Sequence, residues 1–265
     1  MRQWLPDAVR ARFDPGGRYG LRVTLVGIAI VLVAVPFSSL TFQVLADGPI
    51  TRLDGDIANR LNDWVHESDV AVSVLEFISW LGRPVWFYVL IGGACLYLWR
   101  HAHRNRLIIF LVVTSLGGGL VDTAVKIAVN RPRPVVDHPV ATAFGKSFPS
   151  GHAMSSLVCY GALMLVFLPV FRSTRARRAM VAFTTLVVLA IGCSRLMLGV
   201  HFVSDVVGGY VLGAAWLVGA VAAFEIWRVE TGRRATAPLE EGVEPEAAAA
   251  LSPTSHPPQP RTRST

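Results

Sequence analysis

Two apolar segments and the polar link between them set the architecture of the chain: residues 179–227, AMVAFTTLVVLAIGCSRLMLGVHFVSDVVGGYVLGAAWLVGAVAAFEIW. A helix needs about 20 apolar residues to cross the hydrocarbon of a bilayer, and segments 179–194 and 203–227 suit that length. Around the link lie Arg195, His201 and Asp205, which are costly groups inside hydrocarbon. The pattern predicts two membrane helices that meet at one surface, with a polar cluster where they join.

Four more apolar segments precede this pair: 23–43, 84–99 with a possible outer extension from residue 70, 107–129 and 153–170. Composition agrees, because 52% of the 265 residues are hydrophobic and only 16% are charged, against about a quarter in soluble domains. We therefore predict an all-α polytopic membrane protein with six transmembrane helices. The stretch FISWLGRPVWF, residues 77–87, leaves open whether a helix breaks there or continues.

The positive charges indicate how the chain crosses the membrane. Arginines cluster before the first apolar segment and after the second, fourth and sixth, so the positive-inside rule places both termini in the cytoplasm. This distribution explains the net charge of +7 without a nucleic-acid partner. Three parts are predicted: a cytoplasmic segment 1–22, a membrane domain 23–228, and a tail 229–265. The tail is rich in Glu, Ala, Pro, Ser and Thr, which favours disorder.

The first outer loop is predicted to contain an amphipathic helix. Its apolar residues recur at steps of three and four: Ile50, Leu53, Ile57, Leu61 and Trp64. Such a helix is typical of a membrane surface. Two interpretations stay open, a lid that packs on the helix bundle and a gate through which lipid reaches the site.

Three polar stretches fall on the outer side in this topology. They are KIAVNRPRP at 126–134, SFPSGHAMSS at 147–156 and SRLMLGVHFVSD at 194–205. The chain crosses the membrane and returns between the second and the third, so all three are expected to meet at one depth.

In the first stretch, Lys126 and Arg133 are seven residues apart. Two helical turns would align them on one face if the helix continued that far. Arg131 would point elsewhere on the same helix, and Asp122 lies one turn before Lys126, at the spacing of an ion pair.

The second stretch has the features of an anion site. Ser150 suits a helix N-cap, Gly151 lets backbone N–H groups approach a ligand closely, and His152 falls in the first turn. Free N–H groups and the helix dipole at such an end favour a bound anion.

The third stretch adds a pair of catalytic character. His201 and Asp205 are four residues apart, so a carboxylate on a helix can fix one imidazole nitrogen and leave the other free as a nucleophile. Gly199 indicates a turn before the imidazole, and Arg195 is a further cation. Cations and backbone amides recognise phosphate. No Asp/Glu cluster suggests Mg²⁺ and no His/Cys set suggests Zn²⁺, so we predict hydrolysis of a phosphate ester through a phosphohistidine, with no metal or cofactor.

Together the stretches closely resemble the type 2 phosphatidic acid phosphatase family. Its pattern of Lys, six residues, Arg-Pro, then Pro-Ser-Gly-His, then Ser-Arg, five residues, His, three residues, Asp occurs in 126–205 without a mismatch. The resemblance implies that His201 is the nucleophile, Asp205 its orienting partner and His152 the general acid. It implies a phosphate clamp made by Lys126, Arg133, Ser150, Gly151 and Arg195.

The expected protein is an integral lipid phosphatase of a bacterial plasma membrane with its site facing outward. Its substrate is left open between a polyprenyl diphosphate such as undecaprenyl diphosphate, and phosphatidic acid or phosphatidylglycerol phosphate. The oligomeric state is unspecified. Two other classes stay open: a phosphotransferase that uses an acceptor other than water, and a protein that binds or transports lipid phosphate.

Overall fold

A computed structural model describes residues 35–46 and 48–251. The predicted segment 1–22 and the first part of the predicted helix 23–43 lie outside this range, and the described part of that helix is Val35–Leu45. Within the described residues, all regular structure is helical, which confirms the predicted all-α class.

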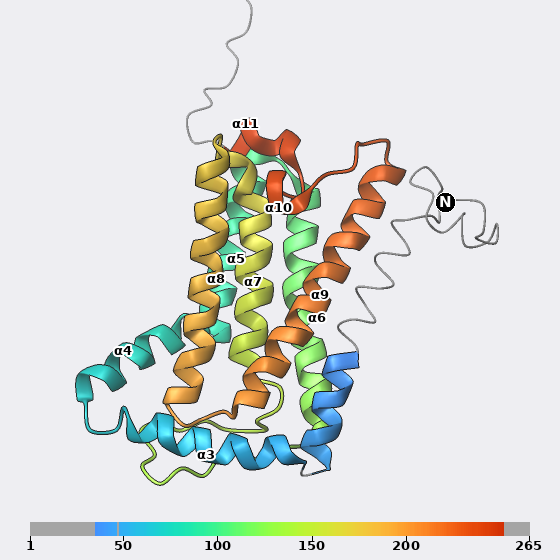
Figure 1. Cartoon of the computed structure of the whole chain (residues 1–265). Helices are drawn as coiled ribbons and strands as arrows, with labels where there is room; N and C mark the ends of the chain where they lie inside the picture. The colour runs from blue at the N-terminus through green and yellow to red at the C-terminus, as the bar shows by residue number, and fades with distance from the viewer. Residues whose placement is uncertain (1–34, 47, 252–265) are drawn as a thin grey trace, which may run out of the picture.

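A bundle of long helices forms the body of the molecule (Figure 1). Its members are α5 (Pro84–Tyr97), α6 (Asn105–Val129), α7 (Gly151–Phe167), α8 (Thr174–Met197) and α9 (Val203–Glu230). Helix α7 lies at the centre, in contact with the other four. Its apolar window is 67% buried, whereas those of α6, α8 and α9 are 22–28% buried. The outer helices therefore present apolar side chains outward, as expected in a bilayer.

Among the described residues, four helices, α6 to α9, are long and apolar enough to cross a membrane, and a fifth span results if α4 (Asp69–Trp80) is joined to α5. The two helices meet at an angle of 45°, so the chain breaks there instead of continuing straight. Pro84 at the first turn of α5 explains the break, because proline disfavours a helical residue before it and clashes with the preceding turn.

Glycines bring α9 close to α7. A Cβ atom on Gly209 would lie 2.6 Å from the carbonyl oxygen of Ser150, and one on Gly213 would lie 3.1 Å from that of Met154. Small residues four apart allow two membrane helices to approach this closely. As a result the start of α7 touches the start of α9, where the Ser150 N–H donates to the Asp205 carbonyl at 2.9 Å.

Helix α3 (Pro49–Asp63) crosses one end of the bundle and is the helix predicted in the first loop (Figure 1). Most of the predicted apolar stripe lies outside its contact face, since Leu53, Ile57 and Trp64 are 60%, 37% and 83% exposed, whereas Ile50 and Leu61 are half-buried. The helix packs instead through buried residues at four-residue steps, which are Asp54, Ala58 and Asn62.

The opposite end is covered by a C-terminal strap, residues 238–251, which contains α10 (Pro238–Glu241), η3 (Pro245–Ala247) and α11 (Ala248–Leu251). Val243, Ala247 and Leu251 are buried in the main apolar cluster. Fully buried Arg228 donates to both Glu246 carboxylate oxygens, at 2.9 and 3.2 Å. The structure differs here from the predicted disordered tail, because a few apolar side chains and ion pairs fix residues up to Leu251; residues 252–265 lie outside the description.

Candidate active site

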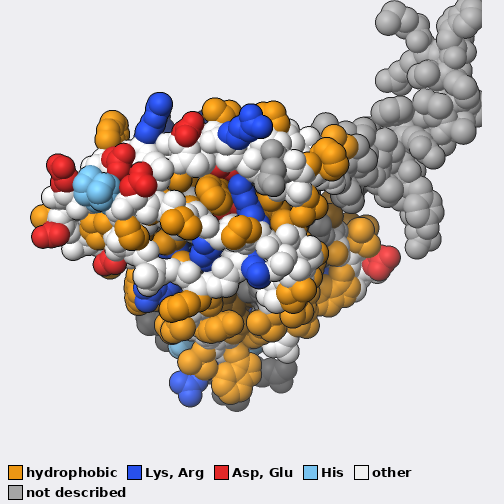
Figure 2. Space-filling model, turned by 90° about the horizontal axis from the view of Figure 1, so that it is seen from below, with side chains coloured by type: hydrophobic (Ala, Val, Ile, Leu, Met, Phe, Trp, Pro, Cys, Tyr) orange, Lys and Arg blue, Asp and Glu red, His pale blue; other side chains and the backbone are white. Residues whose placement is uncertain are grey.

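The three polar stretches meet at the end of the bundle that α3 crosses (Figure 1). The first follows α6, the second opens α7, and the third joins α8 to α9. Seen from this end, Lys and Arg side chains appear in the middle of the face, bordered by hydrophobic ones (Figure 2).

His201 and Asp205 form the contact that their spacing predicted. His201 Nδ1 lies 3.3 Å from Asp205 Oδ2, which also accepts the Phe202 N–H at 3.0 Å. The turn before them requires glycine, because Gly199 has φ +67° and a Cβ there would lie 2.9 Å from Val136 Cγ2. His201 is thereby fixed in a buried position with one nitrogen engaged.

The other nitrogen of His201 faces Arg133. Arg133 Nη1 lies 3.2 Å from His201 Nε2, and the guanidinium is anchored by three carbonyl groups, those of Phe144, Gly145 and Val200. The pKa of His201 is lowered to about 4, chiefly by burial and in addition by the cations Arg133 and Arg195, while Asp205 opposes the shift. With Nδ1–H directed to Asp205, Nε2 of the neutral imidazole accepts from Arg133 Nη1, and a phosphate that draws the guanidinium to its own oxygens would free this lone pair.

Lys126 lies against the first turn of α7. Its ammonium group contacts both Asp122 carboxylate oxygens, at 2.5 and 2.6 Å, as the i,i+4 spacing predicted. A Cβ on Gly151 would lie 2.9 Å from Lys126 Nζ, so the absence of a side chain there leaves the space that the lysine occupies.

Several buried polar atoms have no hydrogen-bond partner among the described residues, and three of them lie in the second and third stretches. These three are Ser150 Oγ, His152 Nε2 and Arg195 Nε. Ser150 occupies the N-cap position of α7, but its hydroxyl does not bond the helix as expected of a cap. Arg195 uses Nη1 to donate to Ser79 Oγ of α4 at 2.5 Å. These atoms are therefore available to a ligand at the N-terminus of α7.

Lys126 and Arg133 are not aligned by one helix, so the prediction that helical spacing brings them together is wrong. Helix α6 ends at Val129, and Asn130 adopts a left-handed conformation with φ 55°. Arg133 reaches the site from the loop, and Arg131 does not point away from the cluster. Arg131 is buried, and its Nη1 donates to Asp205 Oδ1 at 2.6 Å.

Two more residues of this cluster were missed by sequence reasoning, Asp54 of α3 and Ser204 of α9. Both contact Arg131. The repeated Arg-Pro of RPRP, residues 131–134, was a signal that both arginines have a role, whereas no signal in the sequence singled out Asp54 among the acidic residues of its loop.

Comparison with known proteins agrees with the motif. Residues 106–228 match the profile of the PAP2 superfamily. Phosphatidylglycerophosphatase B of Bacillus subtilis is 31% identical over 153 residues, which cover 57% of this chain and 70% of that protein. The chain belongs to the PAP2 superfamily. The matched region contains all eight predicted site residues but not Asp54.

Other PAP2-type relatives carry different substrates in their names. Undecaprenyl-diphosphatase BcrC of Bacillus subtilis is 25% identical over 161 residues, covering 59% of this chain and 77% of that protein. Lipid A 1-phosphatase of Rhizobium johnstonii is 32% identical over 115 residues, covering 40% of this chain and 43% of that protein.

The fold itself is shared with a solved PAP2 structure. The crystal structure of a transmembrane PAP2 type phosphatidylglycerolphosphate phosphatase from Bacillus subtilis matches with a TM-score of 0.65 and 23% identity. The match covers 77% of this chain and 98% of that one. Together with the apolar helices, this similarity identifies the chain as a membrane protein.

Proposed function

We propose that this PAP2 superfamily member is a lipid phosphatase that hydrolyses a phosphate mono- or diphosphate ester through a phosphohistidine. The observation that carries the proposal is the setting of His201, whose Nδ1 lies beside Asp205 while Nε2 lies 3.2 Å from Arg133. A cation beside the free nitrogen brings a phosphate oxygen to the nucleophile.

In the proposed reaction, His201 Nε2 attacks the terminal phosphorus while its bond to the leaving oxygen breaks; this oxygen belongs to the lipid alcohol in a monoester and to the lipid monophosphate in a diphosphate. His152 protonates that oxygen, and the lipid product departs. Water then attacks the phosphohistidine, His152 takes its proton, and inorganic phosphate is released. Charge on the equatorial oxygens is stabilised by the proposed clamp: Lys126, Arg133, Ser150, Gly151 and Arg195. The unpartnered Ser150 hydroxyl and Arg195 Nε support this assignment.

Replacement of the nucleophile tests the scheme. His201→Ala should abolish phosphate release and the trapping of ³²P on an acid-labile, base-stable residue. His138→Ala is the matched control, since this histidine is exposed, and it should retain both signals. Turnover that survives His201→Ala would overturn the phosphohistidine scheme, and lipid phosphate bound by the wild-type protein without any turnover would leave only binding or transport. Turnover that requires an added acceptor would identify a phosphotransferase instead.

The proposed substrate class is a phosphorylated lipid, and the names of the relatives suggest which lipids to test. We propose to measure phosphate release by purified protein from undecaprenyl diphosphate, phosphatidylglycerol phosphate and phosphatidic acid. Release from at least one is expected, with full rates in EDTA because the scheme assigns charge stabilisation to side-chain cations. Strict dependence on Mg²⁺ would contradict it.

We further propose six membrane spans with both termini in the cytoplasm of a bacterial cell, and a site that faces outward. The arginine clusters support this orientation. In a variant without native cysteines, Val135→Cys should react with a membrane-impermeant maleimide on intact cells, because Val135 is 96% exposed in the loop before α7. Thr174→Cys, at the start of α8, should react only after lysis. The reverse result would invert the topology.

A further inference from the structure

Asp54 is an acidic residue of a surface helix that is nonetheless buried. It is 2% exposed and faces the first turn of α9. Its Oδ1 accepts the Ser204 N–H at 3.0 Å, and its Oδ2 accepts the Ser204 hydroxyl and, at 3.0 Å, Arg131 Nη2. A buried carboxylate is costly unless it is paired and hydrogen-bonded, and Asp54 satisfies both conditions.

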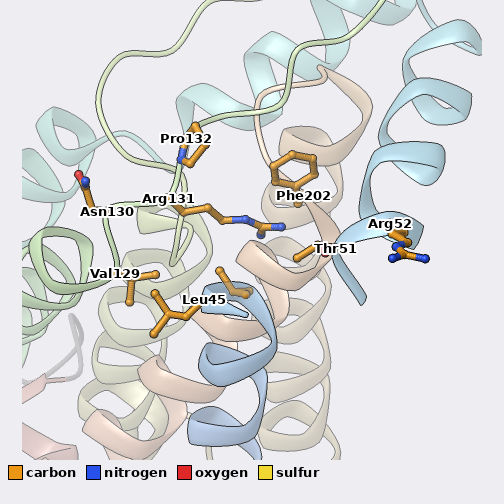
Figure 3. A pocket seen from close by; sticks show the side chains of 9 residues that line it. Leu45, Thr51, Arg52, Val129, Asn130, Arg131, Pro132 and Phe202 are labelled. Atoms are coloured by element: carbon orange, nitrogen blue, oxygen red, sulfur yellow. The ribbon is translucent and has the colours of Figure 1, made fainter. Parts of the chain in front are cut away.

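Arg131 joins two carboxylates through the two ends of its guanidinium. Nη2 contacts Asp54, while Nη1 donates to Asp205 Oδ1 at 2.6 Å and to Ser204 Oγ at 2.7 Å. The guanidinium lies over the Phe202 ring, 4.2 Å from its centre (Figure 3). Only a planar fork of donors can hold two carboxylates in this way.

Ionic contacts, more than packing, fix Arg131. One flank of its side chain borders a cavity of about 540 Å³ between the helix Val35–Leu45, α3 and the end of α6. Figure 3 shows the side chain crossing this space toward Phe202 and α3. If Asp54 were lost, the guanidinium would stay beside Asp205 but would lose the contact that fixes the direction of its Nη1–H toward Oδ1.

The contacts form one continuous path from the surface helix to His201. Arg131 holds Asp205 Oδ1, and the other oxygen of the same carboxylate lies against His201 Nδ1. The path therefore runs from α3 through Asp54, Arg131 and Asp205 to the imidazole. Arg131 makes no contact with His201 Nε2, the nitrogen that Arg133 faces.

We propose that Asp54 and Arg131 are positioning residues, which fix Asp205 against His201 only when α3 is docked on the bundle. The inference rests on the proposed function, because it assigns the two residues to the phosphohistidine reaction. The sequence left open whether α3 is a lid that packs on the bundle or a gate for lipid. On this proposal, α3 packs on the bundle and also contributes Asp54 to the site.

The pH at which His201 becomes protonated distinguishes a positioning role from a merely structural one, because it depends on the charges near the imidazole. The charged and titratable groups facing His201 are Asp205 of α9, Arg133 of the loop, Arg195 of α8 and His152 of α7. Arg131 and Asp54 add one positive and one negative charge behind Asp205. Removing the anion makes protonation of His201 less favourable, and removing the cation makes it more favourable.

The experiment compares Asp54→Asn with Arg131→Gln, measuring kcat and KM for a lipid phosphate in vesicles across pH. The ratio of variant to wild-type kcat/KM at each pH cancels substrate ionisation. Both variants should lose about 10- to 100-fold in kcat, which is typical when a residue that orients a functional side chain is removed. KM should change little. The acid limb should move to lower pH in Asp54→Asn and to higher pH in Arg131→Gln. Asp56→Asn and Arg60→Gln, exposed on the same helix, should behave as wild type.

Unshifted acid limbs, or a raised KM with kcat retained, would overturn the proposal. If either variant fails to fold, Ser204→Ala provides the test, because it removes an uncharged member of the network. Its kcat should fall without a shift of the acid limb. An unchanged kcat would overturn the proposal. Failure of the proposed function gives a different result, because the His201→Ala variant would then release phosphate as fast as the wild-type protein. Turnover that depends on His201 but not on Asp54, Arg131 or Ser204 refutes only the positioning role.

Discussion

The protonation state of His201 follows from its neighbours. Burial disfavours the imidazolium and sets its pKa near 4, while Asp205 opposes this effect. The imidazole is therefore neutral, as a nucleophile must be, over the whole range in which an exposed histidine would titrate.

This has a measurable consequence for the pH dependence of the reaction. After correction for substrate ionisation, the kcat/KM of the wild-type protein should not decline as pH falls from 7 until near pH 4, where His201 becomes protonated. Initial rates on a single lipid phosphate test this. A decline centred on the ordinary histidine value of about 6.5 would contradict the buried setting.

Gly199 offers a second prediction at the scale of one residue. Gly199→Ala forces a side chain into a left-handed conformation, at about 1–2 kcal/mol, and against Val136. Both the thermal midpoint and kcat should fall, because the turn carries His201. Gly232→Ala is the control: φ is +77° there but no atom lies within 4 Å. It should lower the midpoint and leave kcat unchanged.

Sequence reasoning succeeded at this scale where contacts were local. The pair Asp122–Lys126 lies within α6, as helical periodicity predicted. His201 and Asp205 are also four residues apart and in contact, but His201 precedes α9, so this contact forms at the cap of the helix. Arg131 was misassigned because α6 ends four residues earlier than the argument required. Asp54 lies 150 residues from Ser204, and no periodicity spans that distance.

At the scale of elements, the close packing of α7 and α9 holds the proposed anion site against the nucleophile. Gly209→Ala would place a methyl group 2.6 Å from the Ser150 carbonyl oxygen. The helices must then separate, and His152 moves relative to His201. We expect a loss of at least tenfold in kcat, since misplacement by about 1 Å can cost 10²-fold.

The matched change is Gly219→Ala in the same helix, where no atom lies within 4 Å. It should preserve kcat and raise stability by up to about 1 kcal/mol, because alanine favours the helix more than glycine does. Equal effects of the two substitutions on kcat would show that helix spacing does not control the site.

Helix α3 shows what a hydrophobic pattern can and cannot predict. Periodicity correctly predicted the helix, but its apolar stripe is exposed beside the contact face. The contact face carries Asp54, Ala58 and Asn62, so it resembles a solvent-exposed face in the sequence. A polar surface of this kind is recognised only when its buried partners are known, and they lie on α8, α9 and the loop between α6 and α7.

The whole molecule is closed at the end opposite the site by the C-terminal strap. Composition predicted disorder there, because the segment has few apolar residues; the structure shows that Val243, Ala247 and Leu251 are enough when each finds a buried place. The pKa of Glu246 is lowered, chiefly by the hydrogen bonds from Arg228. This contact stabilises the docked strap above the ordinary glutamate pKa and is lost as pH falls through the lowered one.

Undocking the strap should separate stability from catalysis. Val243→Asp buries an unpaired charge and should lower the thermal midpoint in detergent by several degrees, since about 1 kcal/mol corresponds to 2–4 °C at this size. Leu239→Asp, at a residue 68% exposed on α10, should not. Below the transition, kcat should match wild type in both, because the site is at the other end; a large loss of kcat would show that the two ends are coupled.

The order of the helices also bears on biosynthesis. Lys126 emerges with α6, Ser150 and His152 with α7, Arg195 with α8, and His201 only at the threshold of α9. On the proposed roles, a growing chain displays its cations before its nucleophile. On these roles the chain becomes a hydrolase only when its last membrane helix has been inserted and the imidazole meets Asp205.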